Sequence, residues 1–147
     1  MAAINADPEV TRFLHGAATG PFLPKVQKHW DEHGFGFWAV ESREVDLRDR
    51  CLGFVGVAYP TFLPELSHRP EIGWRLAREA WGRGYATEAA MAVRAYARTE
   101  LAIVRLISII HPDNVRSQRV ATKLHMVRAE TVHHPGMQLD VDVWSTR

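Results

Sequence analysis

Hydrophobic residues recur along this chain with two different periods, and each change of period predicts a change of secondary structure. Near the start, apolar residues four apart, such as Phe22 and Val26, predict an amphipathic helix over residues 21–32 that is closed by Gly34. A shorter helix is expected to begin at Asp7-Pro8, because aspartate suits the N-cap and proline suits the first helical position.

The period then shortens to two. Apolar runs bounded by turn residues predict strands over residues 35–40, 52–59, 70–77, 104–110, 127–133 and 138–145. The helical period returns in a long segment, residues 85–101, and in a short one, residues 114–124. The order α-α-β-β-β-α-β-α-β-β predicts an α/β (α+β) fold class in which helices cover the faces of a mixed sheet.

A glycine-spaced turn, Trp81-Gly82-Arg83-Gly84-Tyr85, lies between the third strand and the long helix. Two glycines at i and i+2 lack the Cβ atoms that keep a ligand off the backbone, so several amide N–H groups can point into one concavity at the helix start. Such a concavity suits a phosphate, and Arg78 and Arg83 add positive charge beside it. The small residues that follow predict a helix face that packs closely on a sheet: Ala86, Ala89, Ala90, Val93 and Ala97. Because Gly-x-Gly is also common in purely structural turns, its context must decide.

Composition limits the classes of protein to consider. The chain has 147 residues, 46% of them hydrophobic, which is enough for one domain over residues 1–147 with its own core. Its net charge is +1 with both signs interspersed, so no basic surface predicts a nucleic-acid partner, and no apolar run is long enough to predict a membrane span. A small-molecule partner is expected.

The single cysteine, Cys51, excludes an intrachain disulfide, and its flanks predict a buried, unreactive thiol in a strand. The N-terminus lacks the pattern of a signal peptide, so we expect a cytoplasmic protein. No metal is expected, because His133-His134 beside a Pro-Gly turn lacks the ligand spacing of a zinc site.

Three blocks of residues stand in a recognisable order. They are Glu71-Ile72-Gly73-Trp74-x-Leu76, then Trp81-Gly82-Arg83-Gly84-Tyr85-Ala86-Thr87-Glu88-Ala89, then His111-Pro112-Asp113-Asn114-x-x-Ser117. With these blocks, the chain resembles the GCN5-related N-acetyltransferase (GNAT) superfamily over about residues 7–144, and within it the RimJ/RimL-like branch that acetylates N-termini of ribosomal proteins. The resemblance implies a mostly antiparallel central sheet flanked by helices, and this chain lacks the strand with which the family usually begins.

The resemblance also implies acetyl-coenzyme A as the acetyl donor. The glycine turn would bind its pyrophosphate through backbone N–H groups, and the third strand would pair its backbone with the pantetheine. Asn114 and Ser117 would face the end of the pantetheine. The implied cofactor-binding residues are Trp74, Arg75, Leu76, Trp81, Gly82, Arg83, Gly84, Tyr85, Ala86, Thr87, Asn114 and Ser117.

Attack on a thioester requires an unprotonated amine, so a base or a water held by one is needed. Glu71 is the candidate base, and Ser117 is the candidate proton donor to the departing thiolate, as the matching serine is thought to be in this branch. Each has a structural alternative: Glu71 as a surface carboxylate on its strand, and Ser117 as a residue that satisfies backbone groups in the first helical turn. Asn114 is also a natural N-cap, and Trp74 and Trp81 also suit a core.

The expected activity is transfer of acetyl to a primary amine, either a protein N-terminus or a small molecule, by direct attack in a ternary complex. A non-catalytic acyl-coenzyme A binding module is the alternative, favoured by the missing first strand and by His125, which stands where similar proteins have a helix-ending glycine. A mononucleotide-binding domain ranks last, because the sequence has no glycine-rich phosphate loop that is followed by Lys and Ser or Thr. A homodimer is plausible, since an uncovered sheet edge is a pairing surface.

Overall fold

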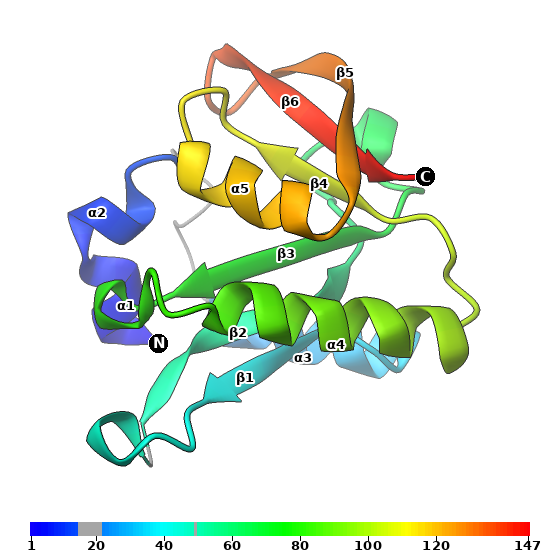
Figure 1. Ribbon diagram of the computed structural model, residues 1–147. Coiled ribbons are helices and arrows are strands. Elements are labelled where there is room, and N and C mark those ends of the chain that lie inside the picture. Colours follow the sequence, from blue (N-terminus) through cyan, green and yellow to red (C-terminus); the bar gives the residue numbers. More distant parts are fainter. Residues whose placement is uncertain (15–21, 49) are drawn as a thin grey trace.

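The computed structural model describes residues 1–14, 22–48 and 50–147 (Figure 1). The helices are α1 (Ala2–Ala6), α2 (Pro8–Thr11), α3 (Phe22–His33), α4 (Tyr85–Thr99) and α5 (Val115–Lys123). The strands are β1 (Phe37–Glu41), β2 (Cys51–Ala58), β3 (Glu71–Leu76), β4 (Ile107–Ile110), β5 (Met126–His134) and β6 (Leu139–Thr146). Short 3-10 turns lie at Val45–Leu47, Pro64–Leu66 and Arg78–Ala80. Each strand that the sequence predicts is present, so the predicted fold class is confirmed.

The strands form one sheet in the order β1-β2-β3-β4-β6-β5. Neighbouring strands are antiparallel except β3 and β4, which are parallel. The chain fills this sheet in two contiguous halves, because β1, β2 and β3 form the first half, and β4, β5 and β6 form the second. Helix α4 connects the halves, and in the described residues no strand precedes β1, which is one edge of the sheet.

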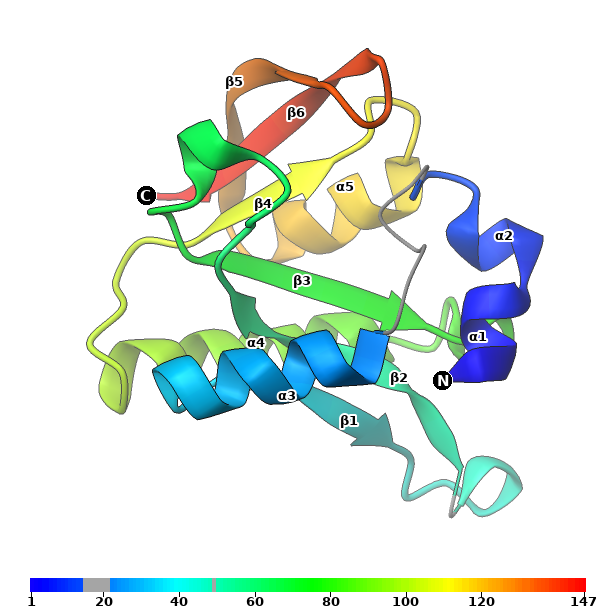
Figure 2. The same cartoon turned by 180° about the vertical axis from the view of Figure 1, so that it is seen from behind.

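Helices cover both faces of the sheet. Two opposite views show α4 and α5 on one face and α3 on the other (Figures 1 and 2). Ala90 and Ala97 of α4 are fully buried in a core that includes Val55 and Ile72 of the sheet, while Ala86, Ala89 and Val93 are partly buried. The small-residue face that the sequence predicts for this helix is therefore confirmed, and its small side chains allow the helix to lie close to β2 and β3.

Two side chains of α3 fix the helix to the first half of the sheet. The His29 ring donates from Nδ1 to the carbonyl of Phe35 at 2.7 Å and accepts at Nε2 from the amide of Tyr59 at 3.1 Å. The Trp30 indole donates to the carbonyl of Phe37 at 3.2 Å. Burial lowers the pKa of His29, which favours the neutral ring that this pair of bonds requires.

The N-terminal residues form two short helices where the sequence predicts one. Asp7 caps α2 as predicted, because its carboxylate accepts from the amide of Glu9 at 2.9 Å. Helix α1 precedes it and has no side-chain cap, so no start signal in the sequence marks it. Both helices lie beside the carboxyl-terminal end of β3 (Figure 1).

Two local predictions are wrong. Cys51 is exposed rather than buried, because it is the first residue of β2 and lies opposite Glu41, where the β1–β2 register shifts. Strand β4 begins at Ile107 rather than residue 104, since Val104 and Arg105 are exposed and belong to the connection from α4.

His125 follows α5 at the position where similar proteins have a helix-ending glycine, and its backbone conformation differs from that of most residues. His125 adopts φ +57°, the left-handed conformation in which glycine has no steric cost. The helix still ends there, because the His125 amide donates to the carbonyl of Thr122 at 2.9 Å.

Candidate functional site

The parallel strands β3 and β4 meet at a single paired position and then diverge. That position is Glu71 opposite Ile107, where the Ile107 amide donates to the carbonyl of Pro70 at 3.0 Å. Toward their carboxyl-terminal ends the two strands spread apart (Figure 1). The sheet is therefore open along this seam.

Glu71 lies at the closed end of the seam. Its Oε1 accepts from the amide of Ile109 at 3.2 Å, so a side chain satisfies an amide that a continuous parallel ladder would pair with a backbone carbonyl of β3. Burial raises the pKa of this carboxyl to about 7, although the bond from Ile109 acts in the opposite direction. At neutral pH the carboxylic acid and the carboxylate are thus both present in substantial amounts.

Backbone groups of β3 face the open seam. The Pro70 carbonyl points toward β4, and successive residues of a strand point their backbone groups to opposite sides, so the amide and carbonyl of Trp74 and the amide of Leu76 also point that way. The Leu76 carbonyl accepts from the Trp81 indole at 2.9 Å. Arg75 is placed differently, since its backbone faces β2, where it pairs with Phe54.

The first turn of α5 lies across the seam from β3. Ser117 Oγ accepts from the Trp74 indole at 3.3 Å, and no described residue accepts the serine proton. Asn114 is the N-cap of α5, because its Oδ1 accepts from the Ser117 amide at 3.2 Å. Asn114 and Ser117 therefore do lie together, with the Ser117 hydroxyl proton available to donate.

The glycine turn leads directly into α4. Gly82 and Gly84 have φ +75° and +87°, and no described atom lies within 4 Å of the place where a Cβ would stand on either. Gly84 is the N-cap of α4 without a side-chain cap, and the first intrahelical bond is the one from the Glu88 amide to the Gly84 carbonyl at 3.0 Å. The amides of Tyr85, Ala86 and Thr87 precede that bond and have no partner within the helix. Backbone donors and open space thus coincide at the start of a 15-residue helix.

The charges around this turn differ from the sequence expectation. Arg83 is paired with Glu44, and with Asp46 at 3.0 Å, so its guanidinium is neutralised from the loop before β2. These carboxylates raise the pKa of Arg83, and Arg83 in turn lowers the pKa of Asp46. Arg78 is exposed and remains a cation beside the turn.

Two aromatic residues of the turn have structural partners. The Tyr85 hydroxyl bonds to Ser42 Oγ at 2.8 Å, and both Trp81 and Tyr85 pack on the core around Leu76. The guanidinium of Arg116 on α5 lies over the Trp81 ring, 4.6 Å from its centroid. The core interpretation of Trp81 therefore holds, while Arg116 connects α5 to the glycine turn.

The side chain of Arg75 lies on the opposite face of β3 from Trp74. It reaches α1, where Nη1 donates to Asn5 Oδ1 at 2.9 Å, and it lies 5.3 Å and 5.8 Å from the ring centroids of Phe54 and Phe22. Its Nε is buried without a hydrogen-bond partner in the described residues, and burial lowers the pKa of the group. No local motif could have paired Asn5 with a residue 70 positions away, so sequence reasoning missed this contact.

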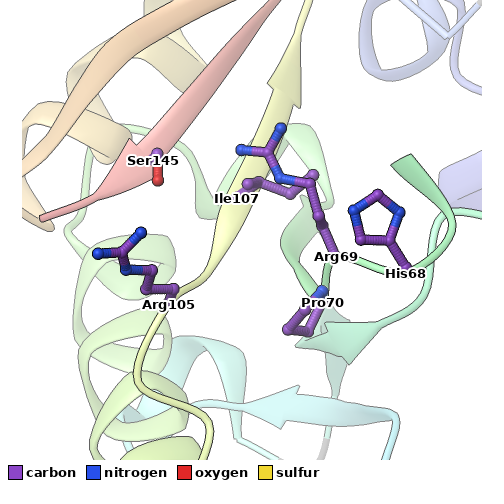
Figure 3. A pocket seen from close by; sticks show the side chains of 6 residues that line it. All are labelled: His68, Arg69, Pro70, Arg105, Ile107 and Ser145. Atoms are coloured by element: carbon purple, nitrogen blue, oxygen red, sulfur yellow. The ribbon is translucent and has the colours of Figure 1, made fainter. Parts of the chain in front are cut away.

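A hollow of about 370 Å³ lies at the closed end of the β3–β4 pair, where Pro70 and Ile107 line it (Figure 3). It is lined by His68, Arg69, Pro70, Arg105, Ile107 and Ser145. Arg69 is already paired with Glu130. This hollow holds none of the residues that the sequence assigns to the cofactor.

Residues 1–14, 22–48 and 50–147 contain neither a candidate metal centre nor a candidate membrane span. No group of three or more His, Cys, Asp or Glu side chains there is arranged to hold a metal ion. No helix in those ranges has the length and apolar character that crossing a membrane requires.

Comparison with known proteins agrees with this geometry. The family of acetyltransferase (GNAT) domains matches residues 1–127. An uncharacterised N-acetyltransferase of Bacillus subtilis (strain 168), YnaD, is 39% identical over 89 residues, which are 60% of this chain and 51% of YnaD, so the chain spans about half of that relative. An acetyltransferase structure from Agrobacterium tumefaciens str. C58 has a TM-score of 0.78 and 26% identity over 99% of this chain and 81% of its own.

A further solved structure shares the fold. It is a ribosomal-protein-alanine N-acetyltransferase from Brucella melitensis, with a TM-score of 0.73 and 18% identity over 98% of this chain and 90% of its own.

Proposed function

Because the chain belongs to the acetyltransferase (GNAT) domain family, we propose that it transfers acetyl from acetyl-coenzyme A to a primary amine by direct attack in a ternary complex. GNAT acetyltransferases use acetyl-coenzyme A as cosubstrate. The observation that carries the proposal is the open β3–β4 seam, which has an ionisable carboxyl at its closed end and free helix amides at its open end.

The described residues fit this cosubstrate in three places. The unpaired amides of Tyr85, Ala86 and Thr87 suit a pyrophosphate, because no described atom lies within 4 Å of the Cβ positions of the two adjacent glycines. The backbone of Trp74 and Leu76 that faces the seam suits pairing with an extended amide-containing arm. Ser117 has a free proton near the same seam. Since Arg83 is neutralised, we assign the additional positive charge to Arg78 and leave Arg83 the role of ordering the turn.

Acetyl-coenzyme A, when bound, supplies an acetyl thioester. Glu71 takes the proton of the acceptor ammonium, directly or through a water, because a carboxyl with a pKa of about 7 is half ionised at neutral pH and is matched to general-base work. The amide of Trp74 or Leu76 donates to the developing oxyanion, an interaction worth about 3 kcal/mol in comparable sites. As the carbon–sulfur bond breaks, Ser117 Oγ, oriented by the Trp74 indole, donates its proton to the leaving sulfur and takes up the second proton of the amine nitrogen, so that the serine is unchanged at the end.

The acceptor class is proposed from the structural relatives. Neighbours of this fold include a ribosomal-protein-alanine N-acetyltransferase, and we extend that class, a protein N-terminal amine, to this chain. The early helices, the loop over residues 61–69 and the turn over residues 134–137 would form the walls of the acceptor groove. Three further points stay predictions: that residues 1–147 form one domain, that the protein is cytoplasmic, and that it forms a homodimer through an uncovered strand edge.

Calorimetric titration with acetyl-coenzyme A, followed by a thiol-release assay on a panel of amines and N-terminal peptides, tests the proposal. Binding with thiol release on one amine class supports it and names that class. Binding without turnover on any acceptor would favour the acyl-coenzyme A sensor instead. Absence of binding would overturn both.

A further inference from the structure

Three arginines are half-buried among the described residues, and of these three only Arg75 has a buried side-chain nitrogen without a hydrogen-bond partner there. Arg69 is paired with the carboxylate of Glu130, and Arg94 donates to the carbonyl of Leu124 where α5 ends. Arg75 has only the neutral side-chain oxygen of Asn5, and its Nε has no hydrogen-bond partner there.

An uncompensated cation in such a position is expensive. Burial of a charged group costs free energy unless a partner offsets the lost hydration, and contact with two aromatic rings offsets it only in part. A ligand with an anionic group would complete this site with a charge-assisted hydrogen bond. The same guanidinium repels polycations, so polyamines and aminoglycosides are poor candidates for the neighbouring groove.

Arg75 stands on the strand face that also carries the candidate base. Side chains alternate along β3, so Glu71, Gly73 and Arg75 share one face. The Phe37 ring lies over Gly73, 3.4 Å from where its Cβ would stand, and so provides an apolar floor between the two charged residues. The Cα atoms of Glu71 and Arg75 are about 13 Å apart in an extended strand. Their functional groups diverge further, because Glu71 bonds to β4 whereas Arg75 reaches α1 beyond the other end of β3.

This spacing sets the length of an acceptor that contacts both residues. The amine and carboxylate of a free α-amino acid are only about 3 Å apart, which is too short to span it. An extended peptide advances about 3.3 Å per residue, so an acidic side chain at the third or fourth residue reaches Arg75 when the terminal amine is near Glu71.

We propose that Arg75 is a specificity residue of the acceptor groove, which selects peptide N-terminal amines that carry an acidic side chain at the third or fourth position. The inference rests on the proposed transferase function and narrows its substrate class.

The test compares kcat/KM for alanine-based peptides that differ only in the fourth residue, which is Glu, Gln or Lys. The wild-type chain is expected to prefer the Glu peptide over the Gln peptide at least tenfold and to use the Lys peptide least. Arg75→Gln should abolish this preference, and Arg75→Lys, which keeps the charge, should retain part of it. Arg98→Gln is the matched control, because Arg98 is exposed in the last turn of α4, on the opposite face of the sheet from α3 and Arg75, and its change removes the same charge.

The outcomes separate the two proposals. Equal use of the three peptides by the wild-type chain, or an undiminished Glu preference in a folded Arg75→Gln variant, would overturn the role of Arg75 and leave the transferase standing. Thiol release with small amines but with no peptide would overturn the substrate class alone. Thermal unfolding of each variant shows whether a lost preference reflects a lost fold.

Discussion

The two edges of β3 differ in how far they are paired: the seam with β2 is closed along its length, and the seam with β4 is open beyond one residue pair. On the β2 side, six residue pairs run from Ala58–Glu71 to Gly53–Leu76, and a Cβ added at Gly53 would lie 2.0 Å from the carbonyl oxygen of Arg75. On the β4 side there is one pair, and a Cβ added at Gly84 beside the open end would meet no described atom within 4 Å. Glycine therefore serves two purposes in this chain: close approach of backbones in the closed seam, and free space for a ligand at the open one.

The largest expected effect comes from breaking the closed seam. Gly53→Ala should lower the free energy of unfolding by about 3 kcal/mol or more, because the backbone around Arg75 and Leu76 has to move. Denaturant unfolding measures this, with Gly73→Ala as the control, since its Cβ would lie 3.4 Å from the Phe37 ring. A Gly53→Ala variant as stable as the Gly73→Ala variant would contradict the closed-seam interpretation.

Filling the open end should affect binding rather than folding. Gly84→Val is expected to weaken acetyl-coenzyme A binding at least 100-fold, because its side chain enters the space beside the free amides of α4. Its positive φ adds strain of about 1–2 kcal/mol. Gly34→Val is the matched control: Gly34 also has positive φ (+72°) and free space, but it ends α3. Equal affinities of the two variants in calorimetry would remove the phosphate role of the turn.

Substitutions of Glu71 test its role as the base at the paired end of the β3–β4 seam. Glu71→Gln keeps an oxygen acceptor for the Ile109 amide but removes the base, so we expect kcat to fall by about 100-fold and the rise in rate with pH through about 7 to disappear. Glu71→Ala also loses the hydrogen bond from the Ile109 amide, so any stability that Glu71→Ala loses beyond the loss in Glu71→Gln measures the contribution of that bond. A Gln variant with the wild-type pH profile would assign deprotonation to water.

The same carboxyl predicts a trend in stability. Its pKa in the folded chain, about 7, lies above its ordinary value of 4.5, so the folded state binds more protons than the unfolded state between these values. Stability from this group is therefore complete below pH 4.5 and falls as pH rises through 7. Denaturant unfolding at several pH values should show that fall in the wild-type chain and less of it in Glu71→Gln.

The smallest expected effect is at Ser117. Ser117→Ala should lower kcat about tenfold with little change in the affinity for acetyl-coenzyme A, because it removes one proton donor while the helix cap by Asn114 accepts from a backbone amide and remains. Single-turnover kinetics and calorimetry separate the two quantities. If the variant turns over at full rate, the serine has a structural role only.

Much of this fold could be predicted because its signals are local. The Asp7 and Asn114 caps, the small face of α4 and the alternating strands each depend on neighbours in sequence, and all are present. Burial of a strand's first residue depends on its neighbours in the sheet, which explains the error at Cys51.

The candidate site likewise combines local features, which the sequence predicts, with contacts between residues far apart in sequence, which it does not. The glycine turn and the Asn114–Ser117 turn are local and lie where the sequence predicts. The neutralisation of Arg83 by Glu44 and Asp46, and the contact of Arg75 with Asn5, join residues 37 to 70 positions apart. The tertiary structure is therefore needed to see that Arg83 is paired with carboxylates whereas Arg75 is not.

The division of the sheet into two contiguous halves also bears on how the chain assembles. Residues 37–76 contain all of β1, β2 and β3, and residues 107–146 contain all of β4, β5 and β6, so each antiparallel unit forms through contacts that are short in sequence. The core beneath Ala90 and Ala97 of α4 takes residues from both units, including Val57 and Leu124. We expect the units to form early and α4 to join them late, so a chain cut within residues 100–106 should yield two fragments that reassociate through the buried face of this helix.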